Sequence, residues 1–278
     1  MDIALFSALI FLGSVTAGFL GSLTGLGGGV VIVPMLTVLF GVDIRYAIGA
    51  SLVSVIATSC GAAATYVKEG FSNIRLGMFL EMATTFGALL GAAVTGMIST
   101  RAIAVIFGIV LLYSSYLSAQ GRPSTAGEDA PDFLANHLHL NGTYPSPHGP
   151  VSYQVHSIPT GFSLMFLAGA LSGMLGIGSG SVKVLAMDRA MHVPFKVSTT
   201  TSNFMIGVTA AASAGVYLNR GYIDPGLAMP VMLGVLLGSF FGSRVLMISR
   251  PKALRIVFAG IILLLGFEMI YNGLTGKP

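Results

Sequence analysis

The sequence predicts an all-α polytopic membrane protein built from two homologous repeats. Of its 278 residues, 54% are hydrophobic and only 9% are charged, whereas soluble domains carry about 25% charged residues. Apolar runs of membrane length recur along the chain, and they fall into two copies of one pattern. We therefore expect two repeats of about five hydrophobic segments each, and each repeat contains one segment broken by glycines at membrane depth.

The first half contains five apolar segments before a polar break, at residues 3–24, 28–40, 46–67, 75–98 and 102–119. The second segment is short and contains Pro34. As a helix it covers only ~20 Å of a ~30 Å hydrocarbon core. A half-helix or re-entrant segment therefore fits better than a full span. The sequence leaves open whether this segment and its later counterpart, 180–192, span or re-enter.

A polar region, residues 120–157, separates the halves. It is rich in Pro, Gly, Ser, Asn and His and has no helical period, which predicts an extramembrane linker that is partly disordered. Its histidines are His137, His139, His148 and His156. They lack carboxylate or cysteine partners at ligand spacing, so we predict no metal site. The expected units are 1–119, the first transmembrane repeat, then the linker, then 158–278, the second repeat.

The apolar pattern returns after the linker, at residues 160–175, 180–192, 197–218, 226–248 and 253–272. A constant offset of 151 relates the halves without a gap. It pairs Gly25, Gly27 and Gly29 with Gly176, Gly178 and Gly180, and it pairs Ser51 with Ser202 and Thr58 with Thr209. A register kept over about ninety residues indicates an internal repeat. Matching broken segments in paired membrane repeats are typical of transporters.

The distribution of basic residues bears on whether the repeats are parallel or inverted. With an odd number of crossings per half and the N-terminus outside, ten basic residues fall inside and four outside. Parallel repeats give at best nine against five. Because basic residues collect on the cytoplasmic side, the count favours inverted repeats.

Glycines interrupt each half at the same place, as Gly25-Leu26-Gly27-Gly28-Gly29 and as Gly176-Ile177-Gly178-Ser179-Gly180. Glycine weakens a helix interior by about 1 kcal/mol relative to alanine. Backbone groups freed in a bilayer are tolerated only where protein or a water-filled cavity satisfies them. Close helix packing through small residues is the alternative explanation. Two matching copies favour a ligand site, because a restarted helix offers an anion unpaired N–H groups and partial positive charge.

The expected substrate-binding residues come from these two breaks and from the Ser/Thr clusters that follow them. They are Gly27, Gly28, Gly29, Ser51, Ser54, Gly178, Ser179, Gly180, Ser181, Lys183, Thr201, Ser202 and Asn203. Hydroxyls and amides can hold an oxyanion without burying another full charge. For the serines, helix packing and bonding back to their own helix is an equally good explanation. Lys183 stands in a short apolar segment where its counterpart is Ile32, which makes it a candidate anion contact.

Three other charged residues have candidate roles. Arg45 and Lys196 occupy equivalent positions before the two clusters and would attract an anion at the two mouths, although snorkelling to the interface explains them equally well. Glu81 lies several residues into its segment and could carry a coupling proton or pair with a cation.

Other function classes have little support in this sequence. There is one cysteine, Cys60, and no P-loop of the form GxxxxGK[ST], so we predict no ATP-driven subunit, no cofactor and no enzyme. The formal charge of +4 comes from basic residues scattered at segment ends. That placement is typical of topology signals and does not indicate nucleic-acid binding.

The chain resembles the TauE/SafE-type sulfite exporters, also called the toluene sulfonyl uptake permease family. The resemblance rests on residues 17–29, Ala-Gly-Phe-Leu-Gly-Ser-Leu-Thr-Gly-Leu-Gly-Gly-Gly, with Val33-Pro34 following, and on 47–52, Ala-Ile-Gly-Ala-Ser-Leu. Weaker copies stand at 173–180 and 198–203. The resemblance covers nearly the whole chain except the linker, whose length departs from the compact family pattern. It implies secondary transport of small sulfur-containing anions such as sulfite, sulfonates or sulfoacetate, coupled to an ion gradient.

We therefore expect a multi-pass protein of the cytoplasmic (inner) membrane that moves a small sulfur-containing anion by alternating access. Its partners would be the anion, the bilayer and a coupling proton or sodium ion, and the oligomeric state is open. One alternative is a passive anion channel, with flux far above transporter rates and no coupling. Another is a cation or proton-coupled carrier centred on Glu81.

Overall fold

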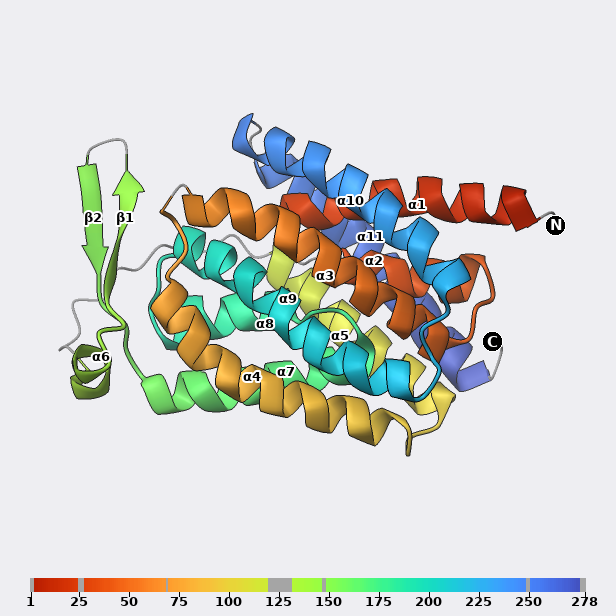
Figure 1. The fold of residues 1–278 in the computed structure, drawn as a ribbon, viewed down its shortest axis with the longest axis horizontal. Coiled ribbons are helices and arrows are strands. Elements are labelled where there is room, and N and C mark those ends of the chain that lie inside the picture. The colour runs from red at the N-terminus through yellow and green to blue at the C-terminus, as the bar shows by residue number, and fades with distance from the viewer. Residues whose placement is uncertain are drawn as a thin grey trace.

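The chain folds into a bundle of helices with a small two-stranded hairpin at one end (Figure 1). The computed structural model describes residues 3–24, 28–68, 70–119, 132–146, 149–248 and 251–275. Within these residues the hairpin is the exception to the expected all-α fold class.

The described residues of the first half form five α-helices and one π-helical turn. They are α1 (Ile3–Thr24), α2 (Gly29–Pro34), η1 (Met35–Leu39), α3 (Ile44–Lys68), α4 (Ile74–Thr95) and α5 (Thr100–Ala119). The second half has the same order of elements: α7 (Ile158–Leu175), α8 (Gly180–Leu185), η2 (Ala186–Ala190), α9 (Phe195–Asn219), α10 (Pro225–Ile248) and α11 (Pro251–Thr275).

Within the described residues, four helices are long and apolar enough to cross a membrane, which supports an integral membrane protein. The qualifying stretches are Leu5–Ser22, Ile74–Thr95, Ile158–Leu175 and Pro225–Gly242. By contrast, α2 and η1 form one helical run over Gly29–Leu39. At 1.5 Å per residue this run rises only about 16 Å, roughly half of the hydrocarbon core. The run therefore has the length of a half-helix, and the matching run of α8 and η2 has the same length.

The linker is folded in the part that the structure describes. It contains the helical turn α6 (Phe133–His137) and the antiparallel strands β1 (Gly142–Ser146) and β2 (Gly149–Tyr153). Ala135, Leu140 and Val155 are buried in an apolar cluster that also includes Leu76 of α4 and Met191. The linker therefore packs on the helical bundle, which its Pro- and Gly-rich composition did not predict.

The large helices pack in four pairs: α1 with α10, α4 with α7, α3 with α9, and α5 with α11. Glycines bring some backbones into direct contact. A Cβ at Gly87 or Gly91 of α4 would overlap the carbonyl of Phe166 or Ala170 on α7. Small residues at such contacts are the usual means of close helix approach in a membrane.

Helices α3 and α9 lie side by side and run antiparallel (Figure 1). Near the start of α3, a Cβ at Gly49 would meet the carbonyl of Tyr222, which follows the end of α9. Beyond the other end of α3, the Phe71 carbonyl accepts a hydrogen bond from Thr200, near the start of α9, at 2.9 Å. This antiparallel pair forms the centre of the molecule.

The close approach of α4 and α7 predicts a penalty for any side chain at Gly91. In Gly91→Ala, the new methyl group overlaps the Ala170 carbonyl, and overpacking of this kind costs about 1–3 kcal/mol. Thermal unfolding in detergent should show a lower midpoint than for wild type. Gly215→Ala is the matched control, because its Cβ would meet no described atom within 4 Å. Equal midpoints for the two variants would contradict the close packing.

Candidate functional site

Both glycine-rich breaks adopt backbone conformations that favour glycine. Gly28, the N-cap of α2, has a φ of 70°, and Gly176 and Gly178 in the second break have φ values of 68° and 67°. Ser179, the N-cap of α8, has a φ of 43°, which is uncommon for a residue with a side chain. The predicted site residue Gly27 lies outside the described residues.

The two breaks meet at helix α3. Gly29, the first residue of α2, packs so closely that a Cβ there would stand 2.7 Å from the Ser51 hydroxyl and 2.9 Å from the Gly176 carbonyl. Ser51 donates a hydrogen bond to that carbonyl at 2.8 Å. Ser51 therefore joins the break of the second half to a helix of the first half, and it satisfies a carbonyl that the end of α7 leaves free.

The other predicted hydroxyls have different partners. Ser202 on α9 donates to the carbonyl of Gly180 at 3.3 Å, and Ser54 donates to Ala50 of its own helix at 2.8 Å. Thr201 accepts a hydrogen bond from the backbone N–H of Asn73 at 3.0 Å. Asn203 is buried. Ser202 thus supports its own break, whereas the bond of Ser54 fits the helix-packing explanation.

Ser179 differs from these hydroxyls because its Oγ has no hydrogen-bond partner among the described residues. The residue is 1% exposed and stands where α8 begins. An unsatisfied buried polar group costs about 1–3 kcal/mol, so a bound oxyanion at this position would relieve that cost. Gly180 follows in the first turn of α8, and the backbone of Ser181 continues the helix, although its side chain lies outside what the structure describes.

Lys183 and Glu81, considered separately from the sequence, come together in the structure. The Lys183 ammonium is fully buried and donates to Thr209 Oγ1 at 2.5 Å. That hydroxyl lies 2.6 Å from Glu81 Oε1, and the Lys183 Nζ lies 3.9 Å from Glu81 Oε2. Thr85 also donates to Oε1, at 3.2 Å, whereas Oε2 has no hydrogen-bond partner among the described residues. Thr209 was missed as a site residue, although the repeat offset pairs it with Thr58.

Arg45 and Lys196 lie at opposite ends of the antiparallel pair α3–α9. Arg45 donates to the Ile98 carbonyl at 3.1 Å, and its guanidinium stands 5.7 Å from the ring centre of Tyr222. The Lys196 ammonium stands 3.9 Å from the ring centre of Phe71. Such cation–π contacts are favourable at partly exposed sites. The two residues therefore lie at the two ends of this helix pair, and their role as mouth charges stays a prediction.

Arg220 is a further basic residue at the Arg45 end that sequence reasoning did not select. Its guanidinium donates to the carbonyls of Ala92 and Ala93 at 2.8 and 2.9 Å, in the last turn of α4. The last carbonyls of a helix generally lack N–H partners within that helix, so Arg220 caps the end of α4.

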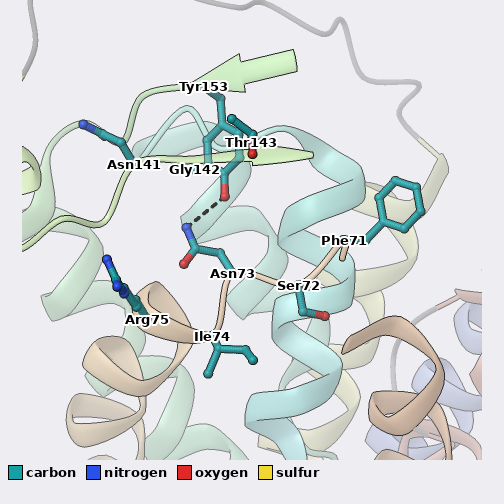
Figure 2. A pocket seen from close by; sticks show the side chains of 9 residues that line it. All are labelled: Phe71, Ser72, Asn73, Ile74, Arg75, Asn141, Gly142, Thr143 and Tyr153. Atoms are coloured by element: carbon teal, nitrogen blue, oxygen red, sulfur yellow. Dashed lines mark hydrogen bonds between the residues drawn. The ribbon is translucent and has the colours of Figure 1, made fainter. Parts of the chain in front are cut away.

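The linker docks at the opposite end, where α4 begins. A cavity of about 220 Å³ lies there, and it is lined by residues 71–75, 141–143 and Tyr153 (Figure 2). The Asn73 side chain donates to the Leu140 carbonyl and to the Tyr153 hydroxyl, both at 2.8 Å. Burial raises the pKa of Tyr153, with the Asn73 contact acting in the opposite direction. Through Asn73, the linker is therefore tied to α4 and to Thr201 of α9.

Comparison with known proteins gives the family. The sequence profile described as Sulfite exporter TauE/SafE matches residues 10–269. The chain belongs to this TauE/SafE family. Relatives include the probable membrane transporter protein YunE of Bacillus subtilis, 29% identical over 97% of this chain and 98% of that protein. The probable membrane transporter protein MJ0441 of Methanocaldococcus jannaschii is 26% identical over 94% of both chains. No solved structure matches the chain at a significant level.

The TauE/SafE match confirms the family suggested by the glycine-rich motifs, and the relatives confirm the class of membrane transporter. The matched region includes both breaks and the Lys183–Thr209–Glu81 cluster. Among the described residues, no group of three or more His, Cys, Asp or Glu side chains could hold a metal ion. The described residues at the centre of this TauE/SafE protein contribute hydroxyls, backbone amides and the buried pair of Lys183 and Glu81.

The contacts of Asn73 predict that it holds the linker in place. Asn73→Ala removes two hydrogen bonds to the linker and the N-cap bond to Leu76, each worth about 1 kcal/mol. Limited proteolysis should then cut the linker faster than in wild type. Thr143→Ala is the control, because Thr143 lines the same cavity and is exposed. Unchanged cleavage in Asn73→Ala would mean that the linker is held by other contacts.

The buried pair predicts strong energetic coupling between Lys183 and Glu81. Removing one charge leaves the other uncompensated, which costs about 3–5 kcal/mol, whereas removing both costs much less. Lys183→Met and Glu81→Gln should each lower the unfolding midpoint, and the double variant should recover most of the loss. Glu268→Gln serves as control, because Glu268 is an exposed carboxylate of α11. Additive losses in the double variant would show that the two side chains do not interact.

Proposed function

We propose that this protein is a secondary transporter that moves a small sulfur-containing oxyanion across the cytoplasmic membrane by alternating access. The observation that carries the proposal is the meeting of the two helix breaks between α3 and α9, with the fully buried cation Lys183 one turn into α8. The family profile, described as a sulfite exporter, supports the substrate class.

In this proposal the anion binds beside the breaks, where the helical run of residues 180–190 begins. Its charge would be offset by Lys183 and by the amide groups of the first turn of that run. The Ser179 hydroxyl is buried and unpartnered among the described residues, so it can donate to an anion oxygen. Asn203, also buried, would line the site from α9 together with Ser202. Gly28 and Gly29 would allow close approach from the first half.

The surroundings of Glu81 favour an anion carrier over a cation carrier centred on this residue. Its carboxylate already accepts from Thr85 and Thr209 and faces the ammonium of Lys183. A transported cation would have to displace Lys183 or bind beside a like charge, which is unfavourable at low dielectric. An anion instead finds a cation that is present in the protein.

We further propose that the two halves are inverted repeats that rock against each other. Three observations support this proposal. The pairs α2 and α8, η1 and η2, α3 and α9, α4 and α10, and α5 and α11 each begin 151 residues apart. Helix packing is reciprocal, with α1 on α10 and α4 on α7. The equivalent helices α3 and α9 run antiparallel, as inversion requires.

The cation–π contacts at the two ends support the same relationship. The offset of 151 converts Arg45 into Lys196 and relates Phe71 to Tyr222. The contact of Arg45 with Tyr222 therefore has its counterpart in the contact of Lys196 with Phe71. A twofold axis that relates the two halves produces such reciprocal contacts, and in inverted repeats this axis lies in the membrane plane.

Thermal stability in detergent against sulfite, thiosulfate, sulfate, sulfoacetate, taurine and chloride, at one ionic strength, tests the function. A ligand of the folded state stabilises by RT ln(1 + [L]/Kd), about 2.7 kcal/mol at a hundredfold excess over Kd. We expect a selective shift with one sulfur oxyanion. Ser179→Ala should weaken this binding by about tenfold or more, because a hydrogen bond to a charged group is lost.

Ser172→Ala is the matched control for that variant. Ser172 is also buried with an unpartnered hydroxyl among the described residues, but it lies inside α7, before the break. Binding in this control should equal that of wild type. No selective shift with any panel anion would contradict the proposed substrate class. Flux in liposomes far above transporter rates, without coupling to a gradient, would identify a channel instead.

A further inference from the structure

The Lys183–Thr209–Glu81 cluster has a feature that the proposed anion site does not require. Lys183 is the cation expected to meet the substrate, yet its charge is already offset by Glu81 at 3.9 Å. Thr209 links the two, because its hydroxyl accepts from Lys183 and lies 2.6 Å from Glu81 Oε1. The substrate and the Glu81 carboxylate therefore compete for the same positive charge.

We propose that Glu81 is the proton-binding group that couples anion transport to a proton gradient, with one proton taken up for each singly charged anion brought to Lys183. This inference rests on the proposed function, and it names the coupling ion. In the empty site, ionised Glu81 balances Lys183. In the loaded site, Glu81 is protonated and the substrate anion balances Lys183. The proton passes from water to Glu81 Oε2, and no other covalent bond changes.

The coupling follows from the cost of an unbalanced charge at membrane depth. Protonated Glu81 without an anion would leave Lys183 uncompensated, and an anion beside ionised Glu81 would add an uncompensated negative charge. Both states bury a net charge, which is strongly unfavourable in a membrane interior. Only the two neutral states are then well populated, so anion and proton bind together.

The geometry identifies Glu81 Oε2 as the oxygen that receives the proton. Oε1 already accepts hydrogen bonds from Thr85 and Thr209, whereas Oε2 is buried and has no hydrogen-bond partner among the described residues. Protonation at Oε2 therefore breaks no existing hydrogen bond of the carboxylate. Oε2 is also the oxygen that faces Lys183, so its neutralisation is felt directly by the ammonium.

The elements around Glu81 carry these other described ionisable groups. In η2, which continues α8, Asp188 and Arg189 stand five and six residues past Lys183. Helix α7, packed against α4, has none. Helix α9 carries Lys196 and Tyr217, which stand 13 and 8 residues from Thr209, or about 20 and 12 Å along the helix axis. Arg75, on α4 itself, precedes Glu81 by six residues, about 9 Å. Lys183 of α8 is the charged partner within 4 Å.

The equivalent position in the first half shows that these charges are not required by the fold. The offset of 151 relates Lys183 to Ile32, Glu81 to Met232 and Thr209 to Thr58. Ile32 is fully buried, and Thr58 bonds back to Ser54 at 2.6 Å. The Thr209 hydroxyl lies 3.0 Å from the corresponding carbonyl, that of Met205, but it is closer to Glu81 Oε1, at 2.6 Å. The packing is thus satisfied by apolar side chains in one half, and the ion pair is an addition in the other.

The test is the pH dependence of sulfite binding by purified wild type and Glu81→Gln. Because binding requires protonated Glu81, wild-type affinity should rise as the pH falls, by up to about tenfold per pH unit more than in the variant. Titration of sulfite itself affects both proteins equally and cancels in the comparison. Thr209→Val should reduce this pH dependence of the sulfite affinity. Thr58→Val, its matched control, should behave as wild type.

A second measurement does not depend on the folding of any variant. In liposomes containing the wild-type protein, an imposed sulfite gradient should drive proton movement in the same direction as sulfite. Identical pH dependence in wild type and Glu81→Gln, or sulfite flux without proton movement, would overturn the inference and leave the anion transporter intact. Absence of sulfite binding at every pH would instead count against sulfite as the substrate in the proposed function.

Discussion

Backbone groups inside a bilayer need partners within the protein, and this constraint shapes the centre of the molecule. Two broken helices free carbonyl and amide groups at the centre of the molecule, and these groups need partners from neighbouring helices. The hydroxyls of α3 and α9 resolve part of the problem: Ser51 bonds to Gly176, and Ser202 bonds to Gly180. These hydroxyls of α3 and α9 therefore have a structural role, because they satisfy backbone carbonyls at the two breaks.

This requirement separates the hydroxyls that support the backbone from those that are available to a ligand. Ser51, Ser54 and Ser202 already donate to carbonyls. Ser179 has a buried oxygen without a partner among the described residues, and its φ of 43° lies in a region that side chains disfavour. Unsatisfied and strained residues tend to persist where function requires them. Ser179 is for this reason a stronger candidate than the clusters that first suggested a site.

Much of the fold follows from the sequence, because apolar runs and glycines report directly on helices and their breaks. The short runs after the breaks, the boundaries near the linker and the pairing of equivalent residues are visible as pattern. The pairing of Glu81 with Lys183 is not, since 102 residues separate them and their contact depends on how α4, α8 and α9 pack. The hairpin was missed because strands with Gly142, Pro145 and Pro150 lack the composition of a strand. The contacts of Asn73 with Tyr153 and Thr201 depend on that hairpin and on α9, so they were equally hidden.

The contacts between the halves at the two ends of α3 and α9 constrain the proposed rocking motion. At one end, Thr200 and Thr201 of α9 bond to the residues that precede α4. At the other end, Arg220 caps the last turn of α4 and Arg45 faces Tyr222. A rotation that opens one end of the pair must break the contacts at that end, whereas the contacts at the opposite end can remain. The linker adds to one set alone, through Asn73. In the proposed motion, opening at the linker end would require either that the linker moves with α4 or that these extra hydrogen bonds break. The two steps of the proposed cycle would then be energetically unequal, although the two halves match closely in sequence register and in the order of their helices.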